Sequence, residues 1–202
     1  MTPFGRGRAF TAADLQAATF PPPRWAVRGL LAEGVNLLAG APKLGKSWLA
    51  LSLSIAVASG GKALGSIDCD QGPVLYLALE DTPRRLQNRM TTLMADEPWP
   101  DALTLLTDWP GHAEGFEYVD SWLAANPTAR MVVVDVLQKI RPSVVTNQSA
   151  YASDYAAISP LMAVAREHTV CVLVVHHTRK ASADDFLDTV SGTNGIVRSE
   201  EH

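Results

Sequence analysis

The chain has 202 residues and a formal net charge of −4; 47% of its residues are hydrophobic and 19% are charged. These values are typical of one globular domain with a substantial core, and they exclude a broad basic surface for nucleic acid but not a local basic channel. Two cysteines, Cys69 and Cys171, are too few and too far apart for a zinc site, and the sequence shows neither an apolar leader nor a segment that could span a membrane. We therefore expect a cytoplasmic protein without membrane contact.

The first 33 residues are predicted to form an N-terminal segment that packs on a core formed by residues 34–202. Thr11 and Asp14 have the spacing of a capping box, which predicts a short helix, and prolines at positions 21–23 end it. We expect Trp25 to pack on the core, with stacking on a nucleotide as the alternative.

Residues 40–47 read Gly-Ala-Pro-Lys-Leu-Gly-Lys-Ser and match the phosphate-binding pattern G-x-x-x-x-G-K-[ST]. The apolar residues 35–39 predict a strand before this loop, and residues 46–59 predict a helix after it that ends at Gly60. This order disfavours a chance match. Backbone N–H groups and the Lys46 ammonium can then hold the phosphates of ATP, and the Ser47 hydroxyl can bind Mg²⁺. The predicted nucleotide-binding residues are Gly40, Ala41, Pro42, Lys43, Leu44, Gly45, Lys46, Ser47 and Trp48.

Further along the chain, apolar runs alternate with helical segments. Strands are predicted at 74–79, 103–106, 131–134 and 170–175, and helices at 84–94, 116–125 and 151–168, the last bent near Pro160. This alternation predicts an α/β fold in which a mostly parallel central sheet has helices on both faces. Ligands bind such sheets at the carboxyl edge of the strands.

Two of these strands end in carboxylates. Asp135 closes the strand at 131–134, where it can hold Mg²⁺ opposite Ser47; a helix-capping or loop-facing role is the alternative. Glu80 follows the strand at 74–79 and is predicted to orient the water that attacks the γ-phosphate. Its alternative is a surface ion pair with Arg84 or Arg85, while Asp81 is expected to cap the next helix.

The last apolar strand ends at His176 and His177, which point to opposite sides because adjacent strand residues alternate. We expect one imidazole to hydrogen-bond the γ-phosphate and the other to pack; zinc binding is the alternative and lacks a third ligand at suitable spacing. Basic residues in the loops beyond Asp135 and beyond His177 are candidate contacts to single-stranded DNA or to a neighbouring subunit, or they are solvated. They are Lys139, Arg141, Arg179 and Lys180.

With these residues, the chain resembles the RecA-like ATPases and, within them, the RepA-like hexameric helicases classed as AAA-family ATPases. The resemblance extends over residues 30–196 and rests on five segments: 34–48 (GVNLLAGAPKLGKSW), 74–81 (VLYLALED), 132–135 (VVVD), 176–180 (HHTRK) and 190–193 (VSGT).

The resemblance implies a RecA-like P-loop fold, ATP and Mg²⁺ as cofactors, and hydrolysis coupled to single-stranded DNA. Glu80 would be the catalytic glutamate, assisted by Lys46, and His177, with His176 close behind, would sense the γ-phosphate. Members of the group act as rings, hexamers among them, with ATP between subunits, an arginine supplied across the interface, and DNA gripped by the loops after Asp135 and His177.

In that group the chain continues past the segment at 191–195 into further strands, whereas this sequence ends at His202. We therefore expect a core without those C-terminal strands and with impaired turnover. The alternative function is a nucleotide-dependent assembly or interaction module that hydrolyses ATP weakly or not at all. A P-loop kinase for a small molecule is a third reading, disfavoured because no segment resembles a substrate lid.

Overall fold

The computed structural model describes residues 9–142 and 150–178. The elements in chain order are α1 (Ala12–Ala17), β1 (Trp25–Val27), β2 (Leu31–Ala32), β3 (Gly34–Gly40), α2 (Lys46–Ser59), β4 (Lys62–Ala63), β5 (Ile67–Asp68), β6 (Val74–Ala78), α3 (Pro83–Met94), β7 (Leu103–Leu106), α4 (His112–Ala125), β8 (Met131–Asp135), the short 3₁₀ helix η1 (Leu137–Lys139), α5 (Ala150–His168) and β9 (Cys171–His177).

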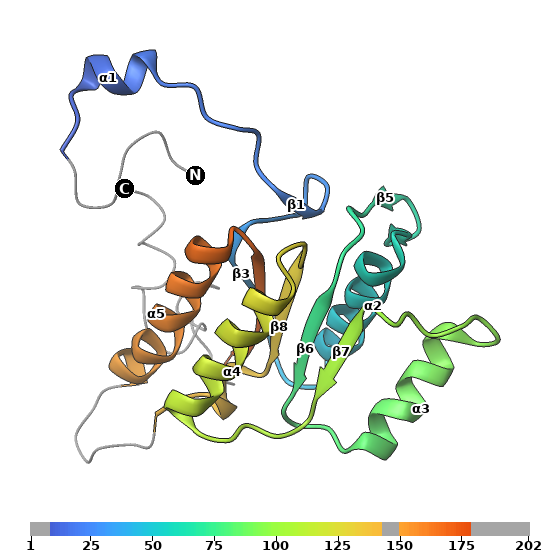
Figure 1. Ribbon diagram of the computed structural model, residues 1–202. Coiled ribbons are helices and arrows are strands. Elements are labelled where there is room, and N and C mark those ends of the chain that lie inside the picture. Colours follow the sequence, from blue (N-terminus) through green and yellow to red (C-terminus); the bar gives the residue numbers. More distant parts are fainter. Residues whose placement is uncertain (1–8, 143–149, 179–202) are drawn as a thin grey trace.

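A five-stranded parallel sheet forms the centre of the fold, in the order β3-β9-β8-β6-β7 (Figure 1). Side chains of α2 and α3 join the hydrophobic cluster on one face, and those of α4 and α5 join the cluster on the other. The predicted α/β fold of the RecA-like P-loop ATPases, with helices on both faces of a parallel sheet, is confirmed.

The central strands are buried on both faces, which explains why the sequence shows continuous apolar runs there. Alternate residues face opposite clusters: Tyr76 and Val133 lie with α2 and α3, whereas Leu75 and Val132 lie with α4 and α5. A polar side chain in one of these strands therefore needs a hydrogen-bond partner inside the protein.

Parallel pairing brings the carboxyl ends of four strands to one edge. Gly40 at the end of β3 pairs with His177 at the end of β9, and Ala78 at the end of β6 pairs with Asp135 at the end of β8. Asp135 in turn pairs with Val175 of β9. The phosphate-binding loop and the polar strand ends are thus placed side by side by the register of the sheet.

Several helix boundaries follow the expected signals. Thr11 and Asp14 form the capping box of α1, and α2 ends at Gly60, whose φ of 68° is left-handed as a glycine allows. Helix α4 begins at His112, four residues before the predicted start, and α5 continues through Pro160.

The expectation that Asp81 caps α3 is wrong. Pro83 occupies the first turn of that helix, so the capping position falls on Thr82, whose hydroxyl accepts a hydrogen bond from the N–H of Arg85. Asp81 forms ion pairs with Arg85 and Arg89 instead.

The N-terminal segment has two parts with different surroundings. Ala26, Val27 and Leu31, in and around the small hairpin of β1 and β2, belong to the cluster beneath α2, and Trp25 is half-buried. Helix α1 has no buried residue and lies apart from the sheet at the end of an extended stretch (Figure 1). The hairpin of β1 with β2 and that of β4 with β5 were not foreseen from the sequence.

Cys171 is a free, buried thiol in β9, as expected, and burial raises its pKa to about 12. Across residues 9–142 and 150–178, none of the helices combines the length and the apolar character that crossing a membrane requires.

Candidate active site

The phosphate-binding loop joins β3 to α2 and has the backbone shape that its glycine pattern predicts. Gly45 takes a φ of 84° at the position before α2, a left-handed conformation that favours glycine, and Lys43 has a φ of 68°. Gly45 occupies the capping position of α2 and has no side chain that could accept a hydrogen bond. The N–H groups in the first turn of α2 therefore receive no side-chain acceptor from Gly45. This arrangement suits a bound anion.

Lys46 folds back over the loop. Its side chain is buried, and Nζ donates hydrogen bonds to the main-chain oxygens of Gly40 and Ala41, each at 2.8 Å. Burial lowers the pKa of Lys46, while the charges of Asp135 and Glu80 oppose that effect. The ammonium thus sits beside the loop, where the phosphates of a nucleotide can replace the two carbonyl oxygens.

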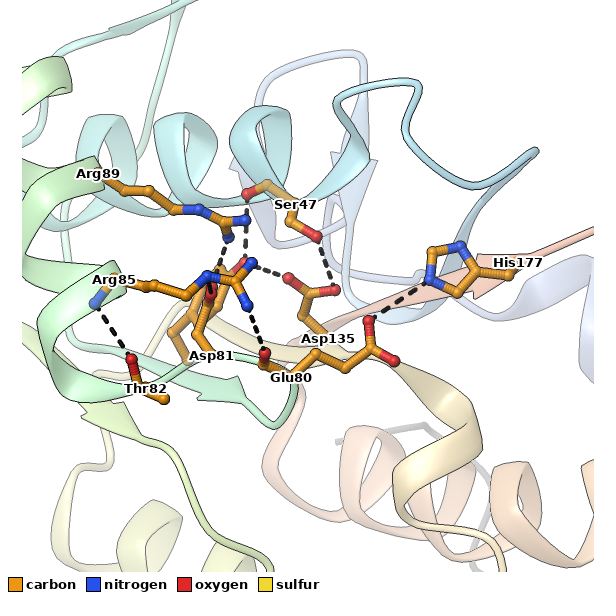
Figure 2. Close-up of polar contacts among 9 residues, drawn as sticks. Ser47, Glu80, Asp81, Thr82, Arg85, Arg89, Asp135 and His177 are labelled. Carbon is orange, nitrogen blue, oxygen red and sulfur yellow. Dashed lines mark hydrogen bonds and ion pairs between the residues drawn. The ribbon is translucent and has the colours of Figure 1, made fainter.

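Ser47 and Asp135 meet across the start of α2 and the end of β8 (Figure 2). The Ser47 hydroxyl donates to Oδ1 of Asp135 at 3.0 Å, and the hydroxyl of Tyr76 donates to Oδ2 at 2.7 Å. Asp135 is 3% exposed. Burial raises its pKa, although both hydrogen bonds favour the charged form. The two residues predicted to hold the metal are therefore in direct contact.

The donors in this pair suit Mg²⁺. A hydroxyl and a carboxylate are hard oxygen ligands, and Mg²⁺ is usually bound through one or two protein groups, with phosphates and water completing the shell. No group of three or more His, Cys, Asp or Glu side chains in the described ranges could hold a metal by itself, which disfavours the zinc alternative for the histidines there.

Glu80 and His177 approach each other at the same edge. Oε2 of Glu80 lies 3.6 Å from Nε2 of His177, and both side chains keep contact with solvent, 49% and 26% exposed respectively (Figure 2). Of the two alternative partners for Glu80, Arg84 and Arg85, the guanidinium of Arg85 pairs with Asp81 and donates only to the main-chain oxygen of Glu80. The Glu80 carboxylate is thus directed toward the histidine at the end of β9.

His176 lies in a different environment. It is 1% exposed, and burial lowers its pKa, against the opposing charge of Asp154 on α5. Arg141 forms an ion pair with the fully buried Asp154 carboxylate. The alternation expected for the two histidines therefore places His177 beside Glu80 and buries His176.

The candidate DNA-contacting residues have different placements. Lys139 is exposed at the end of η1, directly beyond Asp135, whereas Arg141 is engaged by Asp154. Arg179 and Lys180 lie outside the described residues.

Two groups next to the site were not foreseen from the sequence. Tyr76 was treated as one more apolar position, although it is the single polar side chain in the run at 74–79. The guanidinium of Arg89 lies 5.4 Å from the centre of the Trp48 ring and forms an ion pair with Asp81, which ties α3 to the first turn of α2. The i,i+4 spacing in the sequence can suggest the pair of Asp81 with Arg85, but Trp48 is distant in sequence from Arg89.

The comparison with protein families adds one finding. A family model described as an AAA domain matches residues 3–183. That range contains the phosphate-binding loop, Glu80, Asp135 and both histidines.

Proposed function

The chain belongs to this family of AAA domains, which are nucleotide-binding ATPases, and from that premise we propose that it binds ATP with Mg²⁺ at the loop of residues 40–47 and hydrolyses it. One observation carries the proposal: the Ser47 hydroxyl and the Asp135 carboxylate are 3.0 Å apart beside the ammonium of Lys46. A hydroxyl, a carboxylate and a lysine at a helix N-terminus match the parts that P-loop ATPases use to bind phosphate and metal.

Each residue then has a role in the reaction. Lys46 exchanges its two carbonyl partners for oxygens of the β- and γ-phosphates, and the N–H groups at the start of α2 bind the same phosphates. Ser47 and Asp135 would hold Mg²⁺, which would supply positive charge to balance the negative charge on the phosphate oxygens. Glu80 orients and deprotonates the attacking water, and His177 hydrogen-bonds the γ-phosphate.

We further propose that hydrolysis is coupled to single-stranded DNA within a ring of identical subunits, as in the RepA-like helicases that the sequence resembles. Support comes from the partly exposed side chains of Glu80 and His177, which leave this edge open to a residue from a second copy. The exposed Lys139 follows Asp135 closely, so a phosphate backbone bound there would be near the metal site.

ATP turnover tests this function when it is measured with and without single-stranded DNA, alongside the solution mass. We expect Mg²⁺-dependent turnover by an oligomer, stimulated by DNA, and we expect Glu80→Gln to bind ATP normally but to lose turnover. Turnover by Glu80→Gln at the wild-type rate would place the base elsewhere. Slow, DNA-indifferent turnover by a monomer would instead support the nucleotide-dependent interaction module.

A further inference from the structure

We infer that Tyr76 is a positioning residue for Asp135: its buried hydroxyl fixes the orientation of the carboxylate that would hold Mg²⁺. This inference rests on the proposed function, because it concerns the same Mg²⁺ site. Tyr76 lies in the middle of β6 and is fully buried. Its hydroxyl donates to Oδ2 of Asp135 at 2.7 Å and lies 3.2 Å from the main-chain oxygen of Ser47.

Sheet register produces this contact. Ala78 of β6 is paired with Asp135 of β8, and Tyr76 is two residues earlier on β6, so the side chains of Tyr76 and Asp135 point to the same face. The tyrosine ring extends diagonally from Tyr76 on β6 to Asp135 on β8, and its hydroxyl contacts the carboxylate from the side of the hydrophobic core. A phenylalanine at this position would fill the same apolar space without making the contact.

The two oxygens of Asp135 consequently have separate partners. Oδ1 accepts from the Ser47 hydroxyl, and Oδ2 accepts from Tyr76. The terminal torsion of an aspartate has a broad, shallow preference, so the carboxylate plane needs a hydrogen bond to hold it. Tyr76 supplies that bond on Oδ2 and leaves Oδ1 directed toward Ser47, the other predicted metal ligand. Groups of this kind behind a metal ligand commonly control metal affinity.

The hydroxyl of Tyr76 acts as a hydrogen-bond donor, because a phenol is protonated throughout the neutral range. The Tyr76 hydroxyl is also near the main-chain oxygen of Ser47, which belongs to the first turn of α2. One hydroxyl therefore contacts both residues that are predicted to hold the metal, Ser47 and Asp135.

The test is Tyr76→Phe, which keeps the ring and removes only the hydroxyl. We would titrate Mg²⁺ into the full chain with a fluorescent ATP analogue, and repeat the binding without metal in EDTA. We expect the half-saturating Mg²⁺ concentration to rise about 10-fold or more, and binding without metal to stay within twofold of the wild type. Ser54→Ala is the matched control, because it removes another fully buried hydroxyl, from α2, which donates to the main-chain oxygen of Ala50.

The outcomes separate the inference from the function on which it rests. If the wild type binds the nucleotide without any dependence on Mg²⁺, the proposed function fails. If the wild type depends on Mg²⁺ and Tyr76→Phe has the same half-saturation, or weakens binding equally with and without metal, the positioning role is overturned.

A second variant separates positioning from general destabilisation. In an Asp135→Asn background, adding Tyr76→Phe should not raise the half-saturating Mg²⁺ concentration further, because the carboxylate that the tyrosine orients is gone. A full additional 10-fold rise in that background would show that the hydroxyl acts through the fold and not through Asp135.

Discussion

Nε2 of His177 lies 3.6 Å from Oε2 of Glu80. His177 ends β9, whereas Glu80 follows β6, and these two strands are not neighbours in the sheet. Strand β8 lies between β9 and β6, so the contact passes over the end of β8, where Asp135 stands. A γ-phosphate bound at this edge would meet the histidine and the glutamate together. The proposed sensor and the proposed base are therefore in contact with each other.

This contact predicts different effects on ATP and ADP. His177→Ala should lower ATP turnover on the order of 100-fold, the usual loss when one donor to a developing negative charge is removed. The affinity of this variant for ADP, which has no γ-phosphate, should stay within twofold of the wild-type affinity. His168→Ala is the control, since His168 lies at the end of α5 beside Asp120 and precedes the opposite end of β9. Equal losses in turnover for the two variants would rule out a sensor role for His177.

Lys46→Ala should weaken ATP binding by about 10- to 100-fold, as expected when a hydrogen-bonded charge on phosphate is lost. Nζ of Lys46 donates hydrogen bonds to the carbonyls of Gly40 and Ala41, so the variant also frees two oxygens in the loop. Isothermal titration calorimetry with ATP measures the change. Lys62→Ala, which makes the same charge change at an exposed position outside the loop, is the control and should bind ATP like the wild type. Unchanged affinity in Lys46→Ala would refute the assigned site.

Asp81 is predicted to stabilise the fold through its two arginines. Its side chain is 4% exposed and pairs with Arg85 and Arg89, and Arg89 lies over the ring of Trp48. Asp81→Asn should lower the free energy of unfolding by about 1–3 kcal/mol, because a hydrogen bond between charged groups becomes a weaker one. Urea unfolding measures this. Asp96→Asn makes the same charge change at an exposed position and should have little effect; equal losses would contradict the assignment.

Most of the sheet could be predicted from the sequence, because an apolar run and the polar residue that follows it can both be recognised within a short segment. The phosphate-binding loop is recognised by the spacing of its residues. Glu80 and Asp135 each follow an apolar run directly, and His177 follows one after His176. A parallel sheet then brings such ends together without further information. The hairpins of β1 with β2 and of β4 with β5 were missed because two- and three-residue strands leave no periodic pattern.

Contacts that depend on register could not be predicted in the same way. The bond from Tyr76 to Asp135 requires knowledge that β6 pairs with β8 and that Ala78 stands opposite Asp135. A one-residue shift would turn Tyr76 to the other face. The capping error at Asp81 has a similar origin, since Thr82 and Asp81 are both good capping residues and only the start of α3 at Pro83 decides between them.

Burial of His176 predicts a specific dependence of stability on pH. Its pKa in the folded protein is below the ordinary value of 6.5, mainly because of burial, so the unfolded chain binds more protons as the pH falls below 6.5. The free energy of unfolding should therefore decrease as the pH falls from 6.5, by at most about 1.4 kcal/mol per pH unit for this one group.

Replacing the imidazole by an amide isolates this contribution. His176→Gln should flatten the slope of the free energy of unfolding between pH 6.5 and 5, whatever it does to stability at pH 8, because the amide does not titrate. The two proteins differ only at position 176, so the difference between their slopes reports on that position. Urea unfolding of both proteins at several pH values measures the slopes. Identical slopes would mean that His176 takes up its proton equally in the folded and unfolded states, in which case burial does not hold it neutral.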